Sequence, residues 1–396
     1  MKILYLCHRI PYPPNKGEKI RAFHQLQAMS ARHEVDLFTL VDDPADLEHR
    51  AALSKWCRRV AAVPIRPALA RLRALPYLFT ETPLTLPCFH STGLRSEVDR
   101  AFAAEQYDRI FVYSSAMAQY APTNGRVPLL IDLVDVDSDK WTQYSASARF
   151  PYSAIYRREG RFLARYERSI SEKAAVAIVS TEREAGLLRA IAPEARIEVV
   201  PNGVNTEFFS PSAVAPENSG PAIVFTGDMS YFPNEDAVGF FASEVLPLIR
   251  RAIPGVRFLV VGRNPGPKVL RLQQFEGVTI TGFVPDVRTY LAQAQVATAP
   301  FLIAAGIQNK ILEAMSYGLP VVATKRATQG LSRRVGELVE TGETAQELAA
   351  RVVALLRDSG AARRKGLAGR VRVTEEYRWE AALDSLMHLL EAVIPA

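Results

Sequence analysis

Short apolar runs alternate with helix-length segments along the whole chain, and this alternation limits the fold more than any other feature of the sequence. Several runs are almost continuously apolar, which is typical of parallel strands covered by helices on both faces. The runs of the N-terminal half are KILYLC (2–7), EVDLFTLV (34–41), RIFVYS (109–114), PLLIDLV (128–134), AAVAIVS (174–180) and IEVVP (197–201). The pattern predicts an α/β fold with crossover helices.

The same rhythm restarts after a polar stretch with Pro and Gly at 210–221. Its runs are AIVFTG (222–227), VRFLVVG (256–262), VTITG (278–282), VATAP (296–300) and LPVVAT (319–324). A length of 396 residues suits two domains. We therefore expect a Rossmann-like N-terminal domain over 1–201 and a Rossmann-like C-terminal domain over 202–375. A final helix over 376–396 could cross back to the first domain.

Composition and charge exclude several classes of protein. The net charge of +6 suits anionic partners such as sugar nucleotides or acidic lipids. The basic residues are not interleaved with aromatic ones as in a nucleic-acid-binding module, so we expect no nucleic-acid partner. Three cysteines show neither metal-ligand nor redox-pair spacing. The apolar run at 3–7 is shorter than a signal-peptide core or a membrane span, which indicates a cytoplasmic protein.

The loop after the first strand, HRIPYPPNKGEKIR (8–21), is a candidate binding loop, because ligands of open parallel sheets bind at the carboxyl ends of the strands. Gly17 permits close backbone approach just before an expected helix. Nearby basic side chains could hold a phosphate there, namely Lys16, Lys19 and Arg21. An ordinary loop with surface charges explains the segment equally well. The motif G-x-G-x-x-G is absent, which argues against a dinucleotide-dependent dehydrogenase.

The segment APFLIAAGIQNKILEAMSYGLPVVAT (299–324) has the most informative pattern. A buried strand ends at Pro300, a loop of small residues follows, and a helix is expected from near residue 307. The first amides of a helix carry partial positive charge. Five successive residues could therefore present donors to a diphosphate, namely Gly306, Ile307, Gln308, Asn309 and Lys310. Glu313 lies one turn further and could accept hydrogen bonds from ribose hydroxyls. The alternative is a generic helix with a surface Lys–Glu pair.

This string resembles the donor-binding segment of the family-4 retaining glycosyltransferases, which have the GT-B fold of two Rossmann-like domains facing across a cleft. Glu313 matches the glutamate that holds the donor ribose in that family. The resemblance continues, in matching order, through VVPNGVNTEFF (199–209), IVFTGDMSYFPNEDAV (223–238), VLPLIRRAIPGVRFLVVGRNP (245–265) and VTITGFVPDVRTYLAQAQVATAP (278–300). It implies a nucleoside diphosphate sugar as co-substrate, no further cofactor, and an acceptor bound by the N-terminal domain.

Five further residues of the C-terminal half are candidates for the donor site. Gly227 and Gly262 end strands, where the absence of a side chain lets a substrate approach, although plain turn chemistry is the alternative. Arg263 could meet a phosphate or a base. By resemblance, Phe283 and Val284 flank the nucleotide base.

The N-terminal half contains IDLVDVDSDKW (131–141), which includes the D-x-D metal-chelating pattern of the other major glycosyltransferase fold. GT-B relatives neutralise the diphosphate with helix amides and basic side chains, so we expect a metal-independent protein without a metal site. Asp135 stands where many family-4 enzymes have a histidine near the reacting sugar, and it is our candidate for that position.

Two departures from the family pattern bear on activity. Ala305 replaces the first glutamate of the family motif, and residues 227–234 lack its usual Arg and Lys. Lys310, Arg263 or Arg9 could supply the missing charge. The segments NKGEKIR, DVDSDKW, GDMSYFPN and GIQNKILEAM resemble a subgroup, the exosortase-associated (PEP-CTERM system) exopolysaccharide sugar transferases.

These observations predict a retaining hexosyltransferase that moves a sugar from a nucleoside diphosphate sugar to a lipid-linked or growing glycan acceptor in exopolysaccharide biosynthesis. Its catalytic candidates are Asp135, Lys310 and Glu313. Basic and apolar residues at 66–79 and 152–173 could contact the inner face of the cell membrane, although a solvated basic helix face is the alternative. Two other functions stay open: a non-catalytic sugar-nucleotide-binding protein, and a sugar-nucleotide epimerase of the same fold.

Overall fold

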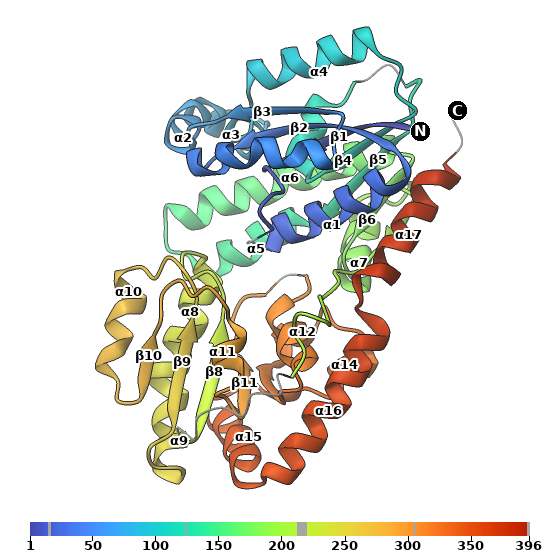
Figure 1. The fold of residues 1–396 in the computed structure, drawn as a ribbon. Helices are drawn as coiled ribbons and strands as arrows, with labels where there is room; N and C mark the ends of the chain where they lie inside the picture. Colours follow the sequence, from blue (N-terminus) through green and yellow to red (C-terminus); the bar gives the residue numbers. More distant parts are fainter. Residues whose placement is uncertain (15–16, 123–124, 212–219, 305, 394–396) are drawn as a thin grey trace. The chain divides into compact units, whose positions relative to one another are not determined.

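The computed structural model describes residues 1–14, 17–122, 125–211, 220–304 and 306–393 (Figure 1). The chain forms two compact units. The N-terminal unit contains Met1–Pro201 together with the chain from Ala382 onward, and the C-terminal unit contains Asn202–Ala381. Helix α17 (Trp379–Ala392) begins in the C-terminal unit, and its residues from Ala382 belong to the N-terminal one.

The N-terminal unit is built on a seven-stranded parallel sheet in the order β3-β2-β1-β4-β5-β6-β7. Its strands are β1 (Lys2–Cys7), β2 (Glu34–Val41), β3 (Arg59–Pro64), β4 (Arg109–Tyr113), β5 (Leu129–Val134), β6 (Val176–Val179) and β7 (Ile197–Val199). Its helices are α1 (Gly17–Arg32), α2 (Pro67–Ala74), α3 (Thr85–Cys88), α4 (Thr92–Ala104), α5 (Asp137–Ser147), α6 (Tyr152–Lys173) and α7 (Glu182–Ile191), with 3-10 segments η1 (Pro44–Lys55), η2 (Leu75–Phe79) and η3 (Ser115–Tyr120).

Both faces of this sheet are buried. Since side chains alternate along a strand, each strand contributes residues to two cores, one on each face. Ile3 and Tyr5 point into the core on one face, and Leu4 and Leu6 point into the core on the other. Leu386 of α17 belongs to the first of these cores, so the last helix covers that face of the sheet.

The C-terminal unit is built on a six-stranded parallel sheet in the order β10-β9-β8-β11-β12-β13. Its strands are β8 (Ala222–Thr226), β9 (Arg257–Val261), β10 (Val278–Ile280), β11 (Val296–Ala299), β12 (Val321–Thr324) and β13 (Glu340–Gly342). Its helices are α8 (Phe232–Phe240), α9 (Leu246–Ala252), α10 (Pro267–Leu270), α11 (Arg288–Leu291), α12 (Asn309–Ser316), α13 (Lys325–Thr328), α14 (Arg333–Gly336), α15 (Ala345–Arg357) and α16 (Ser359–Glu376), with the π segment η4 (Phe241–Val245) and the 3-10 segment η5 (Arg271–Gln274).

The predicted α/β fold with two parallel sheets is confirmed, and several element boundaries differ. Strands β3 and β13 lie outside the apolar runs of the sequence. The helix expected from near residue 307 begins at Asn309, with Gln308 as its N-cap residue. Within the described ranges, no helix is both long and apolar enough to cross a membrane.

The strand order places one switch point in each sheet, where the chain reverses the direction in which it adds strands. It lies between β1 and β4 in the first sheet and between β8 and β11 in the second. In open parallel sheets, ligands bind at the carboxyl ends of the strands beside such a point. The loops after these four strands are therefore where a site is expected.

Candidate functional site

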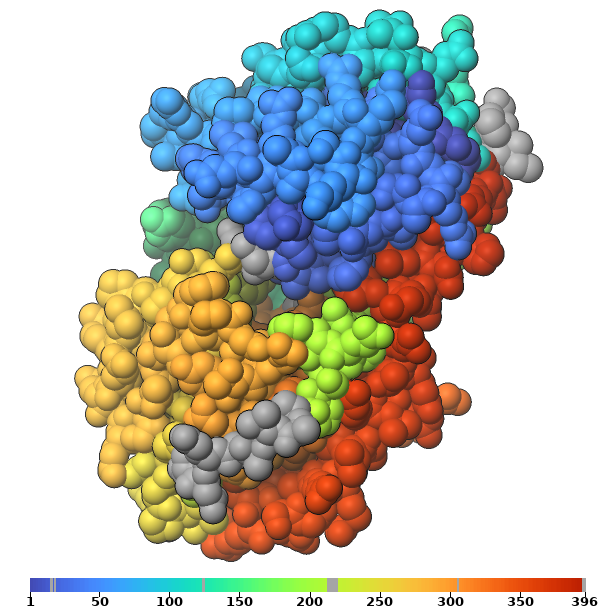
Figure 2. All heavy atoms as spheres, in the orientation of Figure 1, coloured from blue at the N-terminus to red at the C-terminus, as the bar shows by residue number. Residues whose placement is uncertain are grey.

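The switch point of the second sheet lies between the last residues of β8 and β11 (Figure 1). The loop after β8 begins at Gly227 and leads into α8. The loop after β11 begins at Pro300 and leads into α12. Side chains fill the spaces between the ribbons within each unit (Figure 2).

Lys310, on the first turn of α12, reaches this switch point. Its Nζ atom donates a hydrogen bond of 2.6 Å to Oδ1 of Asn234. The same atom lies 4.0 Å from the ring centroid of Phe225 and 4.6 Å from that of Phe301. These rings stabilise an ammonium through their negative faces, so the side chain is fixed on three sides.

Gly227 leaves the space that this ammonium occupies. A Cβ atom on Gly227 would lie 2.9 Å from Nζ of Lys310 and 2.9 Å from Nδ2 of Asn234. Gly262 is packed more closely still, because its Cβ would lie 1.6 Å from the carbonyl oxygen of Gly227. The side chains of Lys310 and Asn234 therefore explain Gly227, and close backbone packing between the loops after β8 and β9 explains Gly262.

Lys310 and Glu313 share one face of α12, three residues apart. Burial lowers the pKa of Lys310 to about 7, although the Glu313 carboxylate opposes this change. Burial raises the pKa of Glu313 to about 7, although the Lys310 ammonium opposes it. A partly buried acid and base with nearly equal pKa values near neutrality are typical of functional sites.

The other residues of this segment that were expected to donate hydrogen bonds to a diphosphate could do so mainly through their backbone amides. Ile307 is packed in the core, and Gly306 has a φ of 59°, a left-handed conformation that favours glycine. The Oδ1 atom of Asn309 accepts a hydrogen bond of 3.2 Å from Nδ2 of Asn202. The Asn309 side chain thus stabilises the start of α12 and is already engaged within the protein. Ala305 lies outside the described residues.

Arg263 forms an ion pair with Asp228, with 2.9 Å between Nε and Oδ2. Burial alone would raise the pKa of Asp228, but hydrogen bonds from Ser230 and Arg263 hold this pKa below its usual value. Phe283 is 74% exposed, whereas Val284 packs partly against the core. Of the two residues predicted to flank the nucleotide base, Phe283 is therefore exposed and Val284 is partly covered by the core.

In the N-terminal unit, Asp135 follows β5. Its Oδ1 atom accepts a hydrogen bond of 2.9 Å from Oγ of Ser180. Burial raises the pKa of Asp135 to about 6, and the nearby carboxylate of Glu184 adds to this effect. Asp135 can therefore exchange a proton close to neutral pH.

The predicted phosphate role of the basic residues in the loop after β1 is wrong for Lys19 and Arg21. Both side chains are buried, Lys19 in an ion pair with Asp46 at 2.6 Å and Arg21 in an ion pair with Asp132 at 2.8 Å. Gly17 is the exposed first residue of α1, and Lys16 lies outside the described residues. Arg9 pairs with Asp42 at 2.8 Å between Nε and Oδ2.

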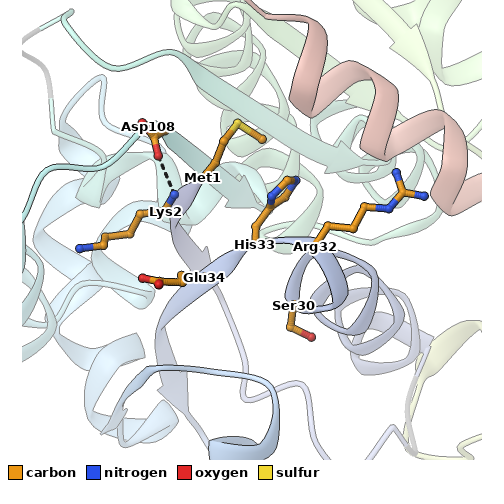
Figure 3. A pocket seen from close by; sticks show the side chains of 7 residues that line it. All are labelled: Met1, Lys2, Ser30, Arg32, His33, Glu34 and Asp108. Carbon is orange, nitrogen blue, oxygen red and sulfur yellow. Dashed lines mark hydrogen bonds between the residues drawn. The ribbon is translucent and has the colours of Figure 1, made fainter.

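A pocket of about 580 Å³ lies at the opposite edge of the first sheet, at the amino ends of β1 and β2 (Figure 3). Its lining residues are Met1, Lys2, Ser30, Arg32, His33, Glu34 and Asp108. The Lys2 amide donates a hydrogen bond of 2.6 Å to Oδ2 of Asp108 there. This edge is not where parallel sheets bind ligands, so the pocket is separate from the candidate site.

Sequence reasoning missed Asn234, Asp228 and the two aromatic rings beneath Lys310. The dipeptide Pro233-Asn234 stands in the first turn of α8. Nothing in the sequence indicates that this amide meets a lysine 76 residues further along the chain.

Two domain families match the chain. Residues 17–203 match the family described as "Glycosyl transferase 4-like domain". Residues 220–358 match the family described as "Glycosyl transferases group 1".

Curated relatives are similar to part of the chain. A phosphatidylinositol N-acetylglucosaminyltransferase subunit of Arabidopsis thaliana is 32% identical over 165 residues, which cover 38% of this chain and 34% of the relative. A GDP-mannose-dependent alpha-(1-6)-phosphatidylinositol monomannoside mannosyltransferase of Mycobacterium tuberculosis is 27% identical over 238 residues, which cover 54% of this chain and 61% of the relative. The matches thus span from about a third to about three fifths of these relatives.

Solved structures show the fold. Sucrose-phosphate synthase of Thermosynechococcus elongatus superposes with a TM-score of 0.75 at 20% identity, over 99% of this chain and 98% of the other. Anabaena Alr3699/HepE in complex with UDP superposes with a TM-score of 0.70 at 16% identity, over 99% and 100% of the two chains. Residues 17–203 are therefore similar to the glycosyl transferase 4-like family and residues 220–358 to the glycosyl transferases group 1 family, in a chain with the GT-B fold.

Proposed function

We propose that this protein transfers a sugar from a nucleoside diphosphate sugar to a lipid-linked or growing glycan acceptor, with retention of the anomeric configuration. The observation that carries the proposal is the pair Lys310 and Glu313 on the first turns of α12, beside the switch point of the second sheet. One group offers a positive charge for a diphosphate, and the other offers a hydrogen-bond acceptor for ribose hydroxyls.

In the proposed reaction, the bond between the anomeric carbon and the diphosphate oxygen breaks, and a bond to the acceptor oxygen forms on the same face. The acceptor hydroxyl gives its proton to the leaving diphosphate. The Lys310 ammonium and the backbone amides near Gly306 stabilise the charge that develops on that diphosphate. Glu313 holds the donor ribose, and Asp135 is the N-terminal unit's candidate for a polar contact with the reacting sugar.

A lipid-linked acceptor is supported by the outer face of α2 and η2. Ala70 and Ala74 of this segment are buried, whereas Leu72 is 61% exposed and Phe79 is 93% exposed. Further large apolar side chains are exposed beside them, namely Leu69, Leu75 and Tyr77. An apolar surface of this kind usually marks a contact with a partner or a membrane.

The charge of the same segment favours an anionic membrane as the partner. Residues 65–80 contain three arginines, Arg66, Arg71 and Arg73, and no acidic residue. Arg158 of α6 orders the backbone beneath by donating hydrogen bonds to the carbonyl oxygens of Leu78 (2.9 Å) and Thr82 (3.0 Å). Apolar side chains flanked by cations bind the interface of anionic bilayers. This surface supports a site of action at the inner face of the cell membrane.

The setting that we propose is exopolysaccharide biosynthesis, on the resemblance of four segments to the exosortase-associated transferases. Sedimentation with vesicles tests the membrane contact. The wild-type chain should co-sediment with vesicles that contain phosphatidylglycerol and not with pure phosphatidylcholine. Leu72→Gln combined with Phe79→Gln should abolish binding, whereas Leu367→Gln on α16, an exposed leucine of the other unit, should leave binding unchanged.

A panel of nucleotide sugars tests the proposed function. A ligand at 100 times its dissociation constant stabilises the folded state by about 2.7 kcal/mol, which a thermal shift detects. We expect one nucleoside diphosphate and its sugar conjugates to stabilise the chain, and the matching sugar to be transferred. Binding without any transfer or hydrolysis would favour the non-catalytic alternative, and interconversion of two nucleotide sugars without acceptor would favour the epimerase.

A further inference from the structure

The loop after β8 and the first turn of α8 carry two polar side chains, Asp228 and Asn234, and each of them holds a cation from another part of the C-terminal unit. Asp228 pairs with Arg263 from the loop after β9. Asn234 accepts a hydrogen bond of 2.6 Å from Lys310 of α12. The Asn234 side chain is itself fixed, because it is buried and its Nδ2 atom donates a hydrogen bond of 2.7 Å to the carbonyl oxygen of Asp228.

The two contacts differ in what they do to the charge of the cation. A carboxylate neutralises a cation that it holds, whereas an amide oxygen orients an ammonium without adding charge. Arg263 faces the carboxylate of Asp228 at 2.9 Å. Lys310 faces an amide, and among the described residues no carboxylate lies within 4.0 Å of its Nζ atom. The charge of Lys310 therefore stays available to an anionic ligand.

The surroundings restrict the Nζ atom to one place. The rings of Phe225 and Phe301 lie beneath it, and Gly227 leaves the gap in which it sits. The amide of Asn234 is the polar partner that this environment provides. A partly buried ammonium without a hydrogen-bond acceptor is destabilised, so the Asn234 contact keeps Lys310 in the site.

We infer that Asn234 is a positioning residue, which holds the ammonium of Lys310 at the switch point of the second sheet so that it can meet the diphosphate of a sugar nucleotide. This inference rests on the proposed function for its ligand. It also explains why residues 227–234 contain no Lys or Arg: this segment supplies the acceptors that place one cation from the loop after β9 and one from α12.

Two substitutions separate orientation from charge. Asn234→Asp keeps an acceptor oxygen beside Nζ and adds a negative charge, which favours the ammonium form. The pKa of Lys310, about 7 in the native chain, should therefore rise. Asn234→Ala removes the acceptor and leaves the ammonium free to move. The other charged groups at this edge, Glu313, Asp228 and Arg263, are unchanged in both variants.

The control is Glu235→Gln, on the same turn of α8. Glu235 pairs with Lys268 at 3.1 Å and not with Lys310. The pKa of Lys310 is measured by the pH dependence of its acylation with acetic anhydride, followed by mass spectrometry. We expect a higher pKa in Asn234→Asp and no change in Glu235→Gln. A residue that merely supports the helix start would leave the pKa of Lys310 unchanged in Asn234→Asp, and that result would overturn the inference.

Calorimetric titration with UDP and with GDP measures the consequence for binding. For whichever nucleotide binds the wild-type chain, we expect affinity to fall roughly tenfold in Asn234→Ala, about 1.4 kcal/mol. It should fall further in Asn234→Asp, where the new carboxylate opposes the diphosphate. Equal affinities in all variants would contradict the positioning role. A wild-type chain that binds neither nucleotide would count against the proposed function, and the acylation result would then decide the Asn234 contact by itself.

Discussion

The amide of Val134 donates a hydrogen bond of 2.9 Å to Oδ1 of Asp132, across an irregularity at the end of β5. Val134 has a φ of 68°, which is rare for a β-branched residue. The other oxygen of Asp132 is held by Arg21 at 2.8 Å and by Gln25 at 2.5 Å. This buried network maintains a strained backbone directly before Asp135, and such strain is characteristic of functional sites.

We expect Val134→Gly to be tolerated, because relief of about 1–3 kcal/mol of backbone strain offsets the lost side chain. The free energy of unfolding in urea should change by less than about 1 kcal/mol. The matched control is Val136→Gly, two residues later, where the side chain is buried and φ is negative. That variant should lose about 3 kcal/mol. Equal losses in the two variants would show that Val134 is not strained.

Arg21→Met should destabilise the N-terminal unit strongly, because it leaves the carboxylate of Asp132 buried with a missing ion-pair partner. The expected loss in the free energy of unfolding is about 3–5 kcal/mol. The control is Arg333→Met, which breaks an exposed ion pair with Glu337 and should cost less than about 1 kcal/mol. A small effect of Arg21→Met would mean that the pair contributes little to the fold.

The pH dependence of stability should report Lys310 and Glu313 separately. The pKa of Glu313 is raised to about 7, so the folded state binds more protons than the unfolded one between the usual glutamate pKa and 7, and stability falls as pH rises through that range. The pKa of Lys310 is lowered to about 7, so the unfolded state binds more protons between 7 and the usual lysine pKa, and stability rises with pH there.

Together these two groups should produce a shallow minimum in stability near pH 7. Thermal unfolding from pH 4 to 11 measures it. Glu313→Gln should make the fall below pH 7 less steep, since Asp135 and Glu167, whose pKa values are also raised by burial, continue to contribute to it. Lys310→Met should remove the contribution of Lys310 to the rise above pH 7. Lys325→Met, an exposed lysine of α13, should leave the curve unchanged. A curve for Lys310→Met that is parallel to the wild-type curve above pH 7 would contradict the lowered pKa.

The fold could be predicted from the sequence because most strands are continuous apolar runs that stop at turn residues. Strand β13 could not, since its three residues Glu340–Gly342 carry no apolar pattern. The burial of Lys19 and Arg21 could not be predicted either, because their partners Asp46 and Asp132 lie 27 and 111 residues away. Charges in a loop look alike in a sequence whether they face solvent or a distant carboxylate.

The candidate site shows the same limit. The spacing on one helix predicts that Lys310 and Glu313 share a face. The sequence cannot indicate that Asn234 and two aromatic rings surround the ammonium, because these residues come from α8, from β8 and from the loop after β11. The resemblance to the family predicts which residue types stand at each position of the donor site. At 227–234 this chain lacks the Arg and Lys of the family pattern, and only the tertiary contacts show how its cations are placed.

Activity should not require a divalent metal. The ammonium of Lys310 and the backbone amides near Gly306 offer counter-charge for the diphosphate in place of a metal ion. Transfer rates in the presence of a chelator, and after addition of magnesium or manganese, measure this. Complete loss of transfer in the chelator, restored by either metal, would instead support chelation by Asp135 and Asp137.

Glu313→Ala should weaken donor binding by about 1.5–3 kcal/mol, the range for loss of hydrogen bonds to a charged group. Calorimetric titration with the nucleotide identified in the panel measures the dissociation constant. Glu337→Ala, an exposed residue paired with Arg333, is the control and should bind the donor normally. An unchanged dissociation constant in Glu313→Ala would exclude Glu313 from the donor site.

The turnover of Lys310→Met tests the central claim most directly. Methionine keeps most of the side-chain stem and removes the ammonium, whose charge should matter most as charge develops on the leaving diphosphate. We therefore expect turnover to fall on the order of a hundredfold, the scale for one lost electrostatic contact in the transition state, while donor affinity falls less. Near-normal turnover in Lys310→Met, with loss of turnover in Arg263→Met or Arg9→Met instead, would contradict the account and place the diphosphate beside those residues.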